Sequence, residues 1–316
     1  MFEIERYTPS QKKEWDSFVR QSRNGTFLFL RDYMDYHGDR FADHSLMAWH
    51  KGRLYAVLPA NLDGDTLHSH QGLTYGGWLM SRQATVEGMC AIFKKMGELA
   101  CQSGIREITY KAIPWIYHTY PAEEDLYALH HISAANISSR HVSSTIDLRS
   151  RIPLTESRKS GLRKAIARNL IIEEGDQKRL EDFWKILENN LSLRHHVTPV
   201  HTLDEMRLLM SRFPDNIRLF VVTEKGCVLG GTLLYLTERV VHTQYISATE
   251  EGKACGALDL LFNELISTNW KSATFFDFGR STIADGHELN SSLLFQKEGF
   301  GARAICYDIY TVKVPK

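Results

Sequence analysis

The pattern of apolar and polar positions along the chain predicts two successive sets of helices and strands. Apolar residues three and four apart predict helices, and short β-branched or alternating runs predict strands. In the first half these patterns predict a strand, a helix, two strands, a helix and a strand over residues 1–7, 10–21, 46–50, 54–60, 84–101 and 107–112. The second half predicts helices over 180–193 and 203–213 and strands over 218–223, 228–236 and 240–247. The similar order of elements in the two halves suggests a duplicated α/β domain.

Chain length agrees with two domains. The sequence has 316 residues, whereas a single hydrophobic core rarely serves more than about 250–300 residues. A strand over residues 143–148 closes the first set, and a basic segment over residues 149–170 opens the second. We therefore expect an N-terminal domain of residues 1–150 and a C-terminal domain of residues 151–316.

Composition excludes several classes of protein. Hydrophobic residues make up 43% and charged residues 24%, as in ordinary globular proteins. Lys and Arg number 38 and so do Asp and Glu, so recognition of a charged partner must rely on local patches. The five cysteines have no paired spacing, and no leader-like or membrane-spanning apolar run occurs. We expect a cytoplasmic protein with reduced thiols and no membrane span.

The stretch over residues 240–301 carries the most specific pattern. A strand is followed by a polar turn, a helix over 257–270, a strand over 273–278 and a helix over 289–298. This order predicts a βαβ crossover whose helix N-terminus faces an anionic group. The stretch also contains Phe-Asp-Phe-Gly-Arg-Ser over residues 276–281 and Lys-Glu-Gly-Phe-Gly over residues 297–301.

These two linked motifs resemble the C-terminal signature of FemAB-like proteins, and the order of elements resembles the acyl-CoA N-acyltransferase (GNAT) fold. The resemblance implies an α/β protein of two GNAT-like domains, each a mixed, mostly antiparallel sheet flanked by helices. It further implies a transferase that passes an acyl or aminoacyl group to an amine, such as one on a cell-envelope precursor or polysaccharide. The implied donor is acyl-CoA or aminoacyl-tRNA, and no metal is expected.

Two other functions fit the same resemblance. The first is an aminoacyl-tRNA-dependent ligase of the peptidoglycan type. Against it, the net charge is zero and no coiled-coil insertion is evident. The second is a binding module that keeps the fold without catalysis. Binding of CoA thioesters and of charged tRNA would separate these functions.

Four residues are the candidate catalytic groups. Asp277 and Arg280 bracket a Phe-Gly bend, where they serve either as a structural ion pair or as contacts to the amine and an anionic group. Lys297 matches a lysine of the family motif and is a candidate for neutralising a phosphate or a developing oxyanion, or is simply a solvated lysine at a helix end. His242, on a predicted strand, is the candidate base, because histidine is the side-chain type that exchanges protons near neutral pH.

A second group of residues is expected to hold the donor. The GNAT pyrophosphate turn is only partly kept, with Lys253, Gly256 and Ala257 present but Leu258 where a small residue is usual. Phe295 stands where a GNAT protein has a tyrosine acid, which favours the FemAB-like branch. Arg163 and Lys164 lie in the basic segment and suit phosphates, or form a solvated helix face.

Aromatic and histidine side chains are the substrate candidates. We expect Tyr75, Tyr117, His118 and Tyr245 to line a substrate groove, although the glycine-rich block around Tyr75 and the acidic segment after His118 also fit plain loop and helix-start roles. The histidines within residues 194–201 lack acidic or cysteine partners at useful spacing. We therefore expect no metal site there.

Overall fold

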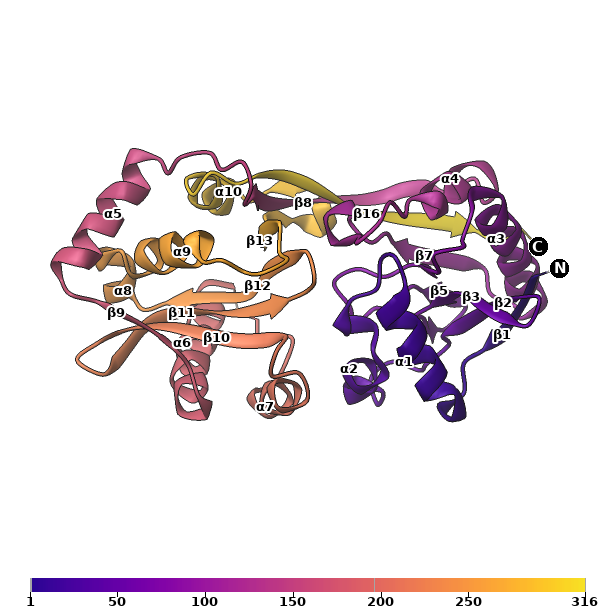
Figure 1. Ribbon diagram of the computed structural model, residues 1–316, viewed down its shortest axis with the longest axis horizontal. Coiled ribbons are helices and arrows are strands. Elements are labelled where there is room, and N and C mark those ends of the chain that lie inside the picture. Colours follow the sequence, from indigo (N-terminus) through magenta and orange to yellow (C-terminus); the bar gives the residue numbers. More distant parts are fainter. Residues whose placement is uncertain (1, 196, 316) are drawn as a thin grey trace. The chain divides into compact units, whose positions relative to one another are not determined.

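The computed structural model describes residues 2–195 and 197–315, so one position of the histidine-bearing segment 194–201 lies outside the described residues. The chain forms two compact units (Figure 1). The N-terminal unit comprises residues 1–141, 282–288 and 306–316, and the C-terminal unit comprises residues 142–281 and 289–305. The chain therefore passes between the two units more than once, whereas the expected boundary near residue 150 implies a single passage. The reason is that two late segments belong to the N-terminal unit.

The N-terminal unit holds two sheets and the helices that cover them. One sheet has the order β1-β2-β3-β6, and the other places β4, β5, β7, β16 and β8 side by side. The strands are β1 (Phe2–Arg6), β2 (Leu46–His50), β3 (Arg53–Leu58), β4 (Asn61–Asp63), β5 (Thr66–His68), β6 (Leu79–Met80), β7 (Glu107–Lys111), β8 (Asn136–Asp147) and β16 (Arg303–Lys313). Residues 142–147 of β8 and 303–305 of β16 belong to the C-terminal unit. The helices are α1 (Lys12–Gln21), α2 (Arg31–Met34), α3 (Val86–Gln102) and α4 (Glu124–His131). Two short strands, β14 (Thr282–Ile283) and β15 (Glu288–Leu289), pair with each other.

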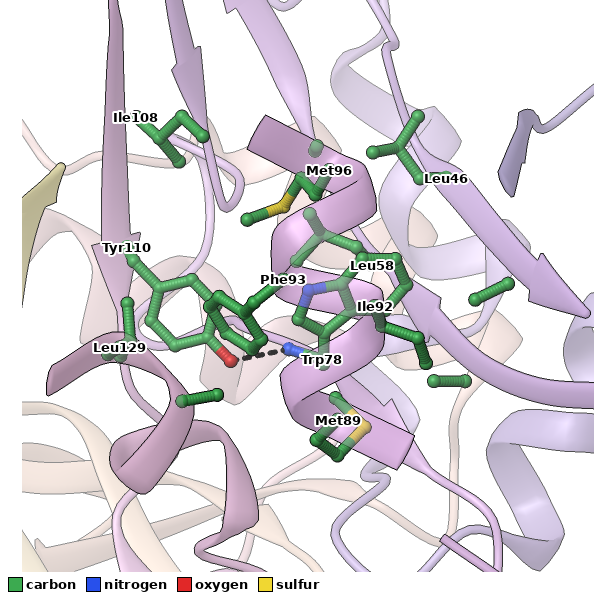
Figure 2. Packing of buried hydrophobic residues seen from close by; sticks show 14 of the residues in the cluster. Leu46, Leu58, Trp78, Met89, Ile92, Phe93, Met96, Ile108, Tyr110 and Leu129 are labelled. Atoms are coloured by element: carbon green, nitrogen blue, oxygen red, sulfur yellow. Dashed lines mark hydrogen bonds between the residues drawn. The ribbon is translucent and has the colours of Figure 1, made fainter. Parts of the chain in front are cut away.

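The core of the N-terminal unit is built on one face of α3. Met89, Ile92, Phe93 and Met96 follow helical spacing and are buried among strand residues (Figure 2). The backbone N–H of Trp78 donates to the hydroxyl oxygen of Tyr110 at 2.8 Å, so a polar pair is satisfied inside this apolar cluster. The predicted helix over residues 84–101 is confirmed as α3.

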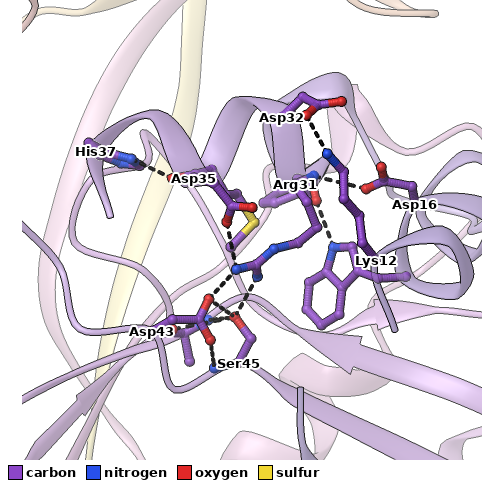
Figure 3. A network of polar contacts seen from close by, with 12 residues as sticks. Lys12, Asp16, Arg31, Asp32, Asp35, His37, Asp43 and Ser45 are labelled. Atoms are coloured by element: carbon purple, nitrogen blue, oxygen red, sulfur yellow. Dashed lines mark hydrogen bonds and ion pairs between the residues drawn. The ribbon is translucent and has the colours of Figure 1, made fainter. Parts of the chain in front are cut away.

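A polar network fixes the start of the N-terminal unit (Figure 3). The guanidinium of Arg31 is 4% exposed and pairs with the carboxylates of Asp35 and Asp43. Its carbon lies 4.0 Å from the centre of the Tyr7 ring. A buried guanidinium requires such partners, because an unpaired buried charge is costly. This network serves the fold.

The C-terminal unit is one mixed sheet with helices packed on it. Its strands lie in the order β8, β13 (Phe275–Arg280), β12 (Val240–Ala248), β11 (Cys227–Leu236), β10 (Ile217–Glu224) and β9 (Ile171–Glu174). All neighbouring pairs are antiparallel except β12 and β13, which are parallel. The helices are α5 (Glu156–Ala167), α6 (Gln177–His195), α7 (Leu203–Arg212), α8 (Glu250–Cys255), α9 (Ala257–Ser267) and α10 (Ser291–Glu298).

The predicted βαβ crossover is present, with β12, α9 and β13 as its elements. Its core is aromatic: the ring of Phe278 lies 4.9 Å from that of Phe262 on α9 and 5.5 Å from that of Phe300, measured between centroids. The expectation that a turn follows β12 is wrong, because residues 250–255 form the short helix α8. Thr249 caps this helix by accepting a hydrogen bond from the N–H of Gly252 at 2.9 Å.

Candidate active site in the C-terminal unit

The site lies where the two parallel strands of the C-terminal unit separate. β12 and β13 pair only from Val240 opposite Phe275 to His242 opposite Asp277. Beyond this point β12 carries a bulge at Gln244, and the register of β13 against β8 shifts between Asp277 and Arg280. Such bulges bend a strand and re-aim its side chains, and they are frequent next to active sites.

His242 and Asp277 form a buried pair at the last paired position. The Nδ1 atom of His242 lies 2.8 Å from Oδ2 of Asp277, and the two residues are 9% and 0% exposed. Asp277 also accepts hydrogen bonds from the hydroxyls of Ser143 and Thr145, at 2.5 and 2.8 Å, and from the N–H of Gly279 at 3.3 Å. A carboxylate held in this way fixes the orientation and tautomer of the imidazole.

Lys297 is buried beside this pair and donates to backbone carbonyls. Its Nζ atom lies 2.9 Å from the oxygen of Gly279 and 2.8 Å from that of Arg280, and the residue is 6% exposed. Burial lowers the pKa of the Lys297 ammonium to about 8, with the nearby charge of Asp277 acting in the opposite direction. The backbone bend that carries the carbonyls depends on Gly279, whose φ of +74° favours glycine.

A pocket of about 260 Å³ opens next to Lys297. It is lined by the end of β12, by Phe278 of β13 and by side chains of α6, α9 and α10. Lys297 lines the pocket and also donates to the backbone oxygens of Gly279 and Arg280, so it lies between the His242–Asp277 pair and the cavity. This combination of convergent polar groups and an apolar cavity is typical of small-molecule sites.

Comparison with known proteins shows which fold carries this site. Residues 156–288 match the family described as acetyltransferase (GNAT) domain. The chain resembles the crystal structure of FemX, with a TM-score of 0.67, 13% identity and coverage of 97% of this chain and 96% of FemX. The chain has a tandem GNAT fold. None of the curated proteins compared with it matches significantly in sequence.

Two further solved structures share the tandem GNAT fold. L-PGS from Bacillus licheniformis has a TM-score of 0.63 and 12% identity, with 99% of this chain and 94% of that chain covered. A tandem GNAT protein from the clavulanic acid biosynthesis pathway has a TM-score of 0.51 and 12% identity, with 100% and 99% covered. The predicted fold class, two GNAT-like domains with mixed sheets, is confirmed.

The expected pyrophosphate turn of the C-terminal GNAT domain is a tight helical corner. Gly256 has a φ of +79° between α8 and α9, and a Cβ atom there would lie 2.2 Å from the carbonyl oxygen of Gly161 on α5. The first turn of α8 carries Glu250 and Glu251, which disfavour a phosphate at that helix start. Lys253 is itself engaged, with its Nζ atom 2.7 Å from Glu250.

The other residues expected to bind the acyl donor lie on α5 and α9, the two helices that meet at this corner. Ala257 is buried at the first position of α9, whereas Arg163 and Lys164 are exposed on α5. Arg158 of α5 pairs with Asp259 of α9 at 2.7 Å, which holds the two helices together. The basic face of α5 is therefore available to solvent, but α5 also covers part of the α9 start. Donor binding by these residues stays a prediction.

The expected substrate residues divide between the two units. Tyr75, Tyr117 and His118 belong to the N-terminal unit and are 2%, 2% and 4% exposed. The rings of Tyr75 and Tyr117 lie 4.4 Å apart, and Tyr307 donates to the hydroxyl of Tyr117 at 3.0 Å. His118 contacts the carbonyl oxygen of Ile113 through Nε2 at 3.1 Å. These are the contacts of a packed cluster, and a substrate role for it stays a prediction.

Tyr245 belongs to the C-terminal unit and follows the bulge in β12. Its hydroxyl lies 2.7 Å from Nδ1 of His201, and its ring packs on that of Trp184 at 5.4 Å. Burial raises the pKa of Tyr245 to about 12. The hydroxyl therefore stays protonated at neutral pH and can donate a hydrogen bond.

Two polar residues of the site were not predicted from the sequence. Ser143 and Thr145 alternate on β8 and donate to Asp277. Their spacing of two in an otherwise buried strand is a signal, because both side chains then point to one face of the sheet. No cluster of three or more metal-ligating side chains occurs in residues 2–195 and 197–315. In the same residues, no helix is both long and apolar enough to cross a membrane.

Proposed function

We propose that this protein is an N-acyltransferase that passes an acyl or aminoacyl group from an activated carrier to an amine. The observation that carries the proposal is the convergence of His242, Asp277 and Lys297 where β12 and β13 separate, beside an apolar pocket. The GNAT fold supports the class of reaction, since the family model matched by residues 156–288 describes acetyltransferases.

The geometry supports a direct transfer. The amine nitrogen attacks the carbonyl carbon of the donor, the bond from that carbon to the carrier sulfur or oxygen breaks, and the amine loses a proton. In this proposal His242 accepts the proton, held in place by Asp277, and later returns one to the leaving group. Lys297 stabilises negative charge on the carbonyl oxygen, or on a phosphate of the donor, with its ammonium. Positioning supplies much of the remaining acceleration.

Acyl-CoA is the first donor to test, and an amine of a cell-envelope precursor or polysaccharide is the first acceptor. The experiment follows thiol release from a panel of CoA thioesters, with hydroxylamine as a general acceptor and the hydroxamate product identified by mass. Thiol release and hydroxamate formation that exceed the spontaneous reaction of hydroxylamine with the same thioester support the proposal. Thiol release without any hydroxamate, or no enzyme-dependent hydroxamate from any thioester or aminoacyl-tRNA, overturns it.

An aminoacyl-tRNA donor is the second candidate. The exposed cations Arg163 and Lys164 on α5 favour it, because a basic helix face suits a polyanion. Filter binding to charged tRNA at two salt concentrations tests this donor, and the charge-reversed variant R163E/K164E should weaken that binding by about tenfold or more. Equal binding by the variant excludes this surface as the tRNA contact. Binding without transfer favours the remaining alternative, a module that keeps the fold without catalysis.

A further inference from the structure

The pocket beside Lys297 is apolar through most of its lining. Six of its hydrophobic lining residues come from α6, β12, α9, α10 and the short segment after α10. These residues are Leu187, Leu191, Ile246, Phe262, Leu293 and Phe300. Leu293 is 38% exposed, so the pocket opens to solvent along α10.

The polar groups at the far end of the pocket are engaged with one another. Asn190 donates through Nδ2 to Ser247 at 2.7 Å and to the carbonyl oxygen of Ala248 at 2.8 Å. Lys253 donates to Asn190 and to Glu250. Because these donors and acceptors already satisfy one another, a ligand gains little from polar contacts at this end, and apolar burial dominates its binding.

Charge in the pocket disfavours an aminoacyl group. The described residues that line it include Lys253 and Lys297 but no aspartate or glutamate. The nearest buried carboxylate to Lys297, Asp277, already receives hydrogen bonds from two hydroxyls and pairs with His242. An aminoacyl donor carries an ammonium one carbon from the reacting carbonyl, so it would meet like charge without a compensating carboxylate.

We propose that the acyl group accepted here is an uncharged hydrocarbon chain of medium length. An apolar cavity of about 150 Å³ holds benzene, so a pocket of 260 Å³ has room for a chain of roughly six to ten carbons. The carbonyl end of that chain lies at Lys297, where two backbone oxygens are the ammonium's hydrogen-bond partners among the described residues. This inference rests on the proposed function, since it names the donor class of the same site.

Calorimetric titration with octanoate and butyrate tests the pocket without turnover. Each buried methylene is worth about fourfold in affinity, so octanoate, with four more methylenes, should bind roughly two-hundredfold more tightly than butyrate. The variant L293W fills the pocket and should lose octanoate binding at least tenfold. F295W is its matched control, because Phe295 is 70% exposed on the same helix. A second filling variant, L191W on α6, guards against misfolding of the first.

The outcomes separate this inference from the proposed function. Octanoyl-CoA should transfer to hydroxylamine faster than acetyl-CoA, and L293W should reverse that preference. Octanoate binding that depends on chain length and on Leu293, without transfer, keeps the pocket assignment and rejects the transferase. Transfer of acetyl or aminoacyl groups with no dependence on chain length rejects the hydrocarbon donor and leaves the transferase standing. Equal binding of octanoate and butyrate also overturns the assignment.

Discussion

The two units each bury a carboxylate, and the two carboxylates differ in what surrounds them. Asp125 in the N-terminal unit accepts a hydrogen bond at 2.6 Å from the hydroxyl of Tyr110, which belongs to the packed core shown in Figure 2. Burial raises the pKa of Asp125 to about 7. Asp277 in the C-terminal unit instead pairs with a histidine and lies near a buried lysine that lines a pocket.

Under the proposed function, this difference separates a carboxylate that serves packing from one that serves chemistry. The partners of Asp125 are a phenol and backbone groups of its own helix, which do not exchange protons near neutral pH. The partner of Asp277 is an imidazole, which is the proposed base. Perturbed groups beside a cavity are candidates for function, whereas similar groups in a closed core are usually structural. Variants in the two regions should therefore change different measurements.

The largest expected effect is on catalysis at Lys297. K297M keeps a side chain of similar length in a buried position, so the fold should survive while the charge is lost. We expect kcat/KM for acyl transfer to fall by about 10²–10³-fold, as for loss of one oxyanion donor. K185M on α6, where the lysine is exposed, is the control and should keep full activity. Equal activity in both variants removes Lys297 from the mechanism.

Asp277 should be next in size. In D277N an amide replaces the carboxylate that accepts from Ser143 and Thr145, and it no longer favours the imidazolium that forms when His242 takes a proton. We expect kcat to fall about a hundredfold. D147N, which alters a surface carboxylate paired with Arg149, is the matched control. A loss in D277N that reflects only unfolding would show in circular dichroism, and retained activity would reduce Asp277 to a structural role.

Asp125 should change stability and not catalysis. Its pKa is raised in the folded protein, so the protonated carboxyl favours the fold, and that stability is lost as pH rises from about 4 through about 7. The part of this stability lost between pH 5 and pH 8 is on the order of 2–3 kcal/mol. Urea unfolding at pH 5 and pH 8 should show this difference in the wild type and a smaller one in D125N. Parallel pH profiles for the two proteins would contradict the assignment.

Local sequence patterns predicted most of the elements and residues around the candidate site. The periodicity of residues 240–298 predicted β12, α9, β13 and α10. The motif resemblance brought forward Asp277 and Lys297, and the place of a histidine on the predicted strand brought forward His242; the structure places Asp277 next to His242 and near Lys297. Long-range pairing accounts for what was missed. The strand β16 pairs with β7, for example Ile309 opposite Lys111, and no local pattern marks that partner. Burial of Tyr75 within a glycine-rich polar block likewise depends on distant residues.

The smallest expected effect is a pH limb in the transfer rate. Burial lowers the pKa of Lys297 to about 8, so the ammonium is present below that pH and is lost above it. If the ammonium stabilises the oxyanion, kcat/KM should fall above pH 8 and be about tenfold lower at pH 9. K297R retains its charge, so its profile should lack this limb even if its maximum is lower. A wild-type rate that rises through pH 8 while K297R stays flat would instead assign Lys297 as a neutral base. A limb shared by both proteins would belong to the acceptor or to another residue.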